Sequence, residues 1–185
     1  CVITTNFDKL LERVFEEKSR PFQGFMHGIQ QHSGFASQLV QGSRCILKLH
    51  GTFEVNETYI FSKQQYDDAY GCDCLDYTKP LAKVLRQIFI SHSLVFIGCS
   101  LELDRTLELF LDVVNSNVFD IPNHFAFFPE FESDNNLEKE TLISSVGIKP
   151  IWYQVTSNED GSQNHDQLEQ LLSFAIDCAN GRAKL

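Results

Sequence analysis

Residues 94–114 read LVFIGCSLELDRTLELFLDVV, and this stretch decides the fold class. Its first four residues are uniformly apolar, which is typical of a strand buried within a parallel sheet. The segment Gly98-Cys99-Ser100 forms a turn of small residues, and the apolar residues beyond it recur at helical spacing. A buried strand, a tight turn and an amphipathic helix together make the repeating unit of an α/β fold.

The same alternation extends in both directions from this stretch. We expect further strands at residues 1–5, 45–49, around 59–61, 124–128 and 150–155, and helices at 7–19, 62–70, 80–92, 135–146 and 166–179. Residues 21–43 hold four glycines and several glutamines, and we interpret them as a loop with short irregular pieces. The pattern predicts a three-layer α/β sandwich with a mostly parallel sheet and helices on both faces. A length of 185 residues suits one domain, spanning 1–185.

Composition excludes several classes of protein. The 15 basic and 25 acidic residues give a net charge of −10, which argues against direct nucleic acid binding. No apolar run approaches the roughly 20 residues that cross a bilayer, and the first residues lack the pattern of a signal peptide. The six cysteines, including the pair Cys72 and Cys74, lack the spacing of a zinc site or a disulfide scaffold. We therefore expect a cytoplasmic protein without a membrane anchor or bound metal.

Ligands of open parallel sheets bind at the carboxyl ends of the strands. The polar candidates there are Asn6, His50 and the segment Gly98 to Ser100. Asn6 at a strand end is also typical of a turn or cap residue, and Asp8 also suits the first turn of a helix. His50 is either a structural residue or a general base, since imidazole has a pKa near 6.5.

The small residues beside these candidates suggest close contact with a ligand. Gly51 permits a sharp turn or the close approach of a ligand to the backbone. Gly98 and Ser100 resemble a cradle for phosphate or ribose, although glycine after a central strand is normal in any α/β fold. Cys99 has no base partner that the sequence identifies, so we interpret it as a buried thiol. The chain contains neither a G-x-G-x-x-G motif nor a Walker-type loop.

Three segments in order carry a family resemblance: TTNFDKLLE at 4–12, KLHG at 48–51 and FIGCSL at 96–101. The series resembles the sirtuin superfamily, and specifically the sirtuin-like domains of bacterial anti-phage defence proteins. The resemblance extends from Val2 to about Ala179. It implies a Rossmann-like fold that binds NAD+ as substrate and cleaves the bond between nicotinamide and ribose.

The resemblance also implies roles for particular residues. Asn6 would position the attacking water and His50 would act as base beside the ribose hydroxyls, which makes these two the catalytic candidates. The residues expected to bind the dinucleotide are Thr5, Asp8, Gly51, Gly98, Cys99 and Ser100. Asp8 would support the nicotinamide pocket, and the last three would line the ribose and phosphates.

Three departures from the family pattern refine this expectation. The zinc ribbon of protein-deacylating sirtuins is missing between His50 and Phe96, and their acyl-lysine tunnel motif is not recognisable. The Gly-rich phosphate loop of the family would precede Cys1, so we expect the chain to be part of a longer protein. The missing ribbon and tunnel motif favour NAD+ hydrolysis that depletes NAD+ in anti-phage defence, with no zinc. An NAD-dependent deacylase, a non-catalytic sensor of NAD or ADP-ribose, and an α/β domain without a nucleotide site are the alternatives. We expect a homo-oligomer with additional domains or a partner protein.

Overall fold

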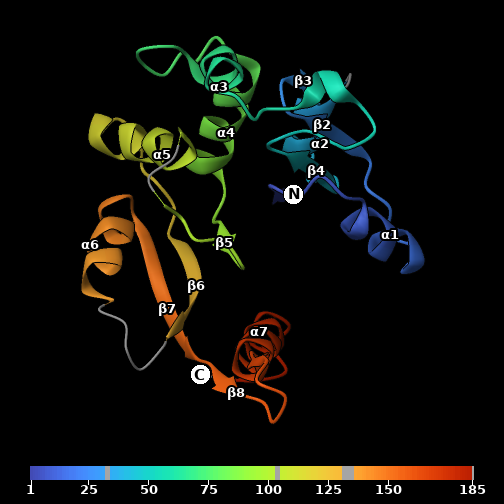
Figure 1. Ribbon diagram of the computed structural model, residues 1–185, viewed down its shortest axis with the longest axis vertical. Helices are drawn as coiled ribbons and strands as arrows, with labels where there is room; N and C mark the ends of the chain where they lie inside the picture. Colours follow the sequence, from blue (N-terminus) through green and yellow to red (C-terminus); the bar gives the residue numbers. More distant parts are fainter. Residues whose placement is uncertain (32–33, 103–104, 131–135, 185) are drawn as a thin grey trace. The chain divides into compact units, whose positions relative to one another are not determined.

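The computed structural model describes residues 1–31, 34–102, 105–130 and 136–184, and the chain divides into two compact units, Cys1–Ile88 and Phe89–Leu185 (Figure 1). Each unit contains a sheet with parallel strands and helices packed beside it. The predicted α/β class, with parallel strands in a Rossmann-like arrangement, is confirmed. None of the helices in the described ranges is both long enough and apolar enough to cross a membrane.

The first unit is built on a sheet in the order β1-β4-β2-β3. These strands are β1 (Val2–Thr4), β2 (Gly24–His27), β3 (Gln30–Gln31) and β4 (Cys45–Lys48). The first three in that order run parallel, and β3 pairs antiparallel with β2. All four residues of β4 are buried, and this strand has a neighbour on each side.

The helices of the first unit alternate with its strands or follow them along the chain. They are α1 (Leu10–Glu17), α2 (Phe35–Val40) and α3 (Lys63–Tyr70), with a 3-10 turn at Asn56–Thr58, and α4 (Pro80–Ser91) begins in the first unit and ends in the second. Ser62 begins α3 with a capping box, in which its hydroxyl accepts the Gln65 N–H while the Gln65 side chain accepts the Ser62 N–H. The predictions of a helix at 62–70, and of another from Pro80, are confirmed.

The second unit holds the parallel strands β5 (Val95–Phe96), β6 (His124–Glu130) and β7 (Ile148–Gln154), with β6 in the middle. Its helices are α5 (Arg105–Ser116), α6 (Leu137–Ser145) and α7 (Asp166–Ala179), and a small hairpin joins β8 (Thr156–Ser157) to β9 (Gln163–Asn164). Both α6 and α7 pack against β7. Phe89 lies between the rings of Phe110 and His124, with centroids 4.2 Å away from each, so stacked aromatic rings form the centre of this core.

Two predictions for the first unit are wrong. Residues 21–43 are not a loop, because they contain β2, β3 and α2. Strand β2 was not recognised in the sequence because it begins with Gly24, which is untypical of a strand. A larger residue does not fit there, since a Cβ at this position would lie 2.6 Å from the Cys45 sulfur. The expected strand at 59–61 is absent, since the chain forms the 3-10 turn instead and Tyr59 donates its hydroxyl to the Phe53 carbonyl.

One helix boundary and the position of one strand also differ from prediction. The first helix begins at Leu10 rather than Phe7, because the Asp8 carboxylate accepts the Leu10 N–H at 2.8 Å and the chain turns there. Among the described strands, β5 is at the edge of its sheet and not at the centre, with Val95 54% exposed. The capping box expected at Asn135 lies outside the described residues, and α6 begins after Asn136.

Candidate functional site

The carboxyl ends of β1 and β4 form one edge of the first sheet. The two strands are parallel, with Thr4 opposite Lys48. Beyond the strands, the Leu49 N–H donates to the Thr4 carbonyl at 2.9 Å, and the Phe53 N–H donates to the Phe7 carbonyl at 3.2 Å. Segments 5–8 and 49–53 therefore leave the sheet side by side, as the sequence predicted for a ligand-binding edge.

An open hollow of about 520 Å³ lies at this edge, lined by Thr5, Asn6, Phe7, Asp8 and Phe53. Three of the predicted site residues, Thr5, Asn6 and Asp8, are therefore brought together. All three are exposed, so their hydroxyl, amide and carboxylate groups are accessible. The two phenylalanines give the hollow an apolar wall, and the mixture suits a flat aromatic ring that also carries polar groups.

Local hydrogen bonds hold the segment of Asn6 and Asp8 in place. The Asn6 N–H donates to the Thr4 hydroxyl at 3.1 Å, and the Asp8 side chain caps the first turn of α1. The Asp8 carbonyl accepts a hydrogen bond from the Lys48 ammonium. The backbone on one side of the hollow is thus tied both to helix α1 and to strand β4.

Lys48 is the unusual residue of this edge, because it is fully buried in the central strand of the sheet. Its Nζ lies 2.9 Å from the carboxylate of Glu12, which is the buried residue of α1. The apolar side chains Leu10 and Val14 of α1 are 64% and 44% exposed. The helix presents Glu12 to the sheet, because a buried ammonium needs a counter-charge.

His50 lies two residues beyond β4 and is half-buried. Its ring centroid is 6.2 Å from that of Phe7, and its Nε2 is 3.0 Å from the hydroxyl oxygen of Tyr66 on α3. Its backbone carbonyl accepts the Ile60 N–H at 3.2 Å. Phe7 thus lines the hollow and also lies next to His50, which is not among the described residues that line the hollow.

Gly51 follows His50 and has a structural reason to be glycine. Its φ is +96°, and an added Cβ would lie 2.4 Å from the backbone oxygen of Thr58. The turn at Asn56–Thr58 therefore packs directly against Gly51, the residue that follows His50. Contact between Gly51 and a ligand stays a prediction.

The remaining predicted residues, Gly98, Cys99 and Ser100, follow β5 in the second unit and are exposed. Gly98 has a φ of +66°, and no described atom would lie within 4 Å of an added Cβ. Glycine is needed there for its backbone conformation and not for lack of space. The expectation of a buried Cys99 thiol is wrong, because this strand is at the edge of its sheet. The dinucleotide contacts of the three residues stay predictions.

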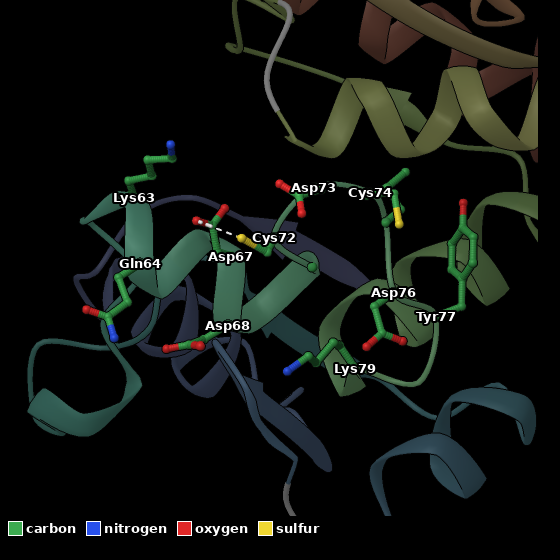
Figure 2. Close-up of a pocket in the computed structure, with 12 residues that line it drawn as sticks. Lys63, Gln64, Asp67, Asp68, Cys72, Asp73, Cys74, Asp76, Tyr77 and Lys79 are labelled. Carbon is green, nitrogen blue, oxygen red and sulfur yellow. Dashed lines mark hydrogen bonds between the residues drawn. The ribbon is translucent and has the colours of Figure 1, made fainter.

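A larger pocket of about 950 Å³ lies around α3 and the loop that follows it (Figure 2). Its lining includes four aspartates, two lysines and both cysteines of the C-x-C pair: Asp67, Asp68, Asp73, Asp76, Lys63, Lys79, Cys72 and Cys74. Hydrogen bonds from the hydroxyl and N–H of Thr78 hold the pKa of Asp76 below its usual range. A pocket with more carboxylates than ammonium groups repels phosphate.

The described residues contain no group of three or more His, Cys, Asp or Glu side chains arranged to hold a metal ion. Two residues of the site were not singled out from the sequence. Lys48 had a signal, since a lysine inside an otherwise apolar strand requires a buried partner. Tyr66 had none, because only the fold brings α3 next to His50.

Comparison with known proteins identifies the family of the chain. A family model described as a SIR2-like domain matches residues 1–151. That range contains both segments of the strand edge, the hollow and the glycine turn after β5. A search of curated proteins found no match.

Proposed function

The chain belongs to the SIR2-like domain family, and from this premise we propose that it is an NAD+ glycohydrolase. The family has an NAD-related function, and the hydrolysis of NAD+ is our finer assignment. One observation carries it: Asn6 and Asp8 line an accessible hollow at the ends of two parallel strands, and Phe7 connects this hollow to His50. This arrangement can hold the nicotinamide end of a dinucleotide.

The proposed reaction consumes one water molecule for each NAD+. The bond between C1′ of the ribose and the pyridinium nitrogen breaks, and its electron pair passes to nicotinamide, which leaves as a neutral molecule. The water oxygen bonds to C1′, and its proton passes to a base and then to solvent. The products are nicotinamide, ADP-ribose and a proton. A transition state of oxocarbenium character needs orientation and electrostatic support more than a covalent nucleophile.

Each residue of the site then has a task. The rings of Phe7 and Phe53 give nicotinamide an apolar surface, and the exposed Asn6 amide can orient the attacking water. His50 takes up a proton as general base, a contribution typically worth about 10²–10⁴ in rate. Asp8 supports the nicotinamide pocket from the start of α1. Contacts of Gly98, Cys99 and Ser100 with ribose and phosphates stay a prediction of the family resemblance.

Hydrolysis is favoured over protein deacylation by the segment between His50 and Phe96. This segment lacks the two paired-cysteine motifs of a zinc ribbon, and it holds only Cys72 and Cys74. In accordance with the family resemblance, we propose that the activity depletes NAD+ in anti-phage defence. The active form would be an oligomer within a larger cytoplasmic protein.

The test is NAD+ consumption by the full-length protein, with the products identified by chromatography. Asn6→Ala and His50→Ala should each lower the rate at least about a hundredfold while the protein stays folded. His165→Ala is the matched control, because this exposed histidine lies far along the chain in the second unit. Retention of activity in both site variants, or turnover that requires an acylated peptide, would contradict the proposal.

A further inference from the structure

Lys48 is a buried charged residue to which the proposed reaction assigns no task. It is the last residue of β4, it lies opposite Thr4 of β1 and His27 of β2, and it is fully buried. From this position its ammonium contacts two groups near the start of α1, which are the Glu12 carboxylate at 2.9 Å and the Asp8 backbone carbonyl. The second contact connects the sheet to the hollow, because Asp8 lines it.

Stability alone is a weak reason for this buried ion pair. Replacing such a pair with apolar residues of similar size is often neutral or stabilising, because both charges give up their hydration when they are buried. The pair is also incompletely satisfied, since Glu12 Oε2 is buried and has no hydrogen-bond partner among the described residues. An apolar residue at position 48 would lack the donor to the Asp8 carbonyl. This hydrogen bond is therefore what the lysine adds to the site.

We propose that Lys48 is a positioning residue for the dinucleotide site: its ammonium fixes the backbone at Asp8 and thereby the segment that lines the hollow. This inference rests on the proposed function, in which Asn6 orients the attacking water and Asp8 supports the nicotinamide pocket. A hydrogen bond from an ammonium is stronger than a neutral one, and burial protects it from screening by salt. Loss of this contact lets the segment shift, and a displacement of about 1 Å can cost about a hundredfold in rate.

The chain supplies a matched control in the other half of the ion pair. Both Lys48→Met and Glu12→Gln break the pair and leave one buried charge without its counter-charge, so both should destabilise the fold. Only Lys48→Met removes the donor to the Asp8 carbonyl, since the ammonium is still present in Glu12→Gln. A purely structural role predicts the same kinetic effect in both variants, whereas a positioning role separates them.

The first experiment measures kcat and KM for NAD+ in the full-length protein, at a temperature at which circular dichroism shows each variant to be folded. We expect kcat/KM to fall at least about tenfold in Lys48→Met and by less than about twofold in Glu12→Gln. If Lys48→Met does not fold, the double variant replaces it, because it leaves no unpaired buried charge, and it should show the same fall. Equal losses in the lysine variant and in Glu12→Gln, or an unchanged kcat/KM without the ammonium, would overturn the inference.

A second measurement does not depend on activity. Amide hydrogen exchange, followed by NMR, reports how firmly the segment is held, because the Phe53 N–H donates to the backbone carbonyl that precedes Asp8. The Ile60 N–H, which is also hydrogen-bonded within the first unit, serves as the internal reference for the stability of that unit. Relative to Ile60, exchange at Phe53 should be about tenfold faster in Lys48→Met and unchanged in Glu12→Gln.

The two measurements separate a failure of this inference from a failure of the proposed function. An unchanged exchange ratio in Lys48→Met, or in the double variant where it replaces the single one, would overturn the inference even if the protein hydrolyses NAD+. A wild type without NAD+ hydrolysis would contradict the proposed function instead, and the exchange ratio would still decide whether Lys48 holds the segment.

Discussion

Replacement of Lys48 by methionine tests how the site is held to the sheet. The substitution keeps most of the apolar stem of the side chain but removes the ammonium. The carboxylate of Glu12, whose side chain is 10% exposed, then loses the counter-charge at 2.9 Å, and the Asp8 carbonyl loses a donor. Leaving a buried charge without its partner costs about 3–5 kcal/mol. Because Glu12 keeps slight access to water, we expect a cost near the lower end, about 3 kcal/mol.

The assay is urea unfolding of the wild type, Lys48→Met, Glu12→Gln and the double variant, followed by circular dichroism. Glu12→Gln should also be destabilising, since it leaves the buried ammonium without a counter-charge. The double variant should be more stable than the sum of the two single losses implies, with a coupling free energy of about 1–3 kcal/mol. A loss below about 1 kcal/mol in Lys48→Met, or strictly additive losses, would refute the buried ion pair as the support of this edge.

Three further predictions concern stability. Burial lowers the pKa of His124 to about 4, below the value near 6.5 expected in the unfolded chain. The free energy of unfolding should therefore be highest above about pH 6.5 and should fall by about 3 kcal/mol as the pH drops to 4. His124→Asn should flatten this pH dependence in urea unfolding, and an unchanged pH dependence would argue against the prediction. Gly51→Ala should lower the free energy of unfolding by at least about 2 kcal/mol, because the added Cβ would meet the Thr58 backbone. Gly161→Ala, at a similar positive φ but in open space, should lower it by about 1 kcal/mol. Equal shifts of the melting temperature in the two variants would contradict this reasoning. Ser62→Ala should cost about 1 kcal/mol by removing the cap of α3, and an unchanged melting temperature would count against the cap.

Local sequence patterns predicted much of the fold. The β-branched run at Val2–Thr4 and the apolar run at Cys45–Lys48 form adjacent parallel strands, and the expected helix at 166–179 has those bounds in the structure. These elements are readable because their side chains follow the period of the strand or helix. The parallel pairing then placed the predicted Asn6 and His50 at the same edge.

The features that escaped prediction depend on partners distant in sequence. Strand β2 lacked a readable pattern, because Gly24 is small to make room for the Cys45 sulfur. Glu12 is buried against Lys48 in spite of an apparently polar position on its helix. Only the tertiary fold brings Tyr66 to His50. In each case a contact between separate elements decided the conformation, and no local pattern encodes such a contact.

The most direct test of the central claim is the rate of NAD+ consumption by the full-length protein beside its His50→Ala variant. Our account predicts nicotinamide and ADP-ribose in equal amounts from the wild type without any acylated peptide, and loss of at least about 99% of this activity in the variant. Equal consumption by the two proteins, or none by the wild type in its assembled form, would contradict it.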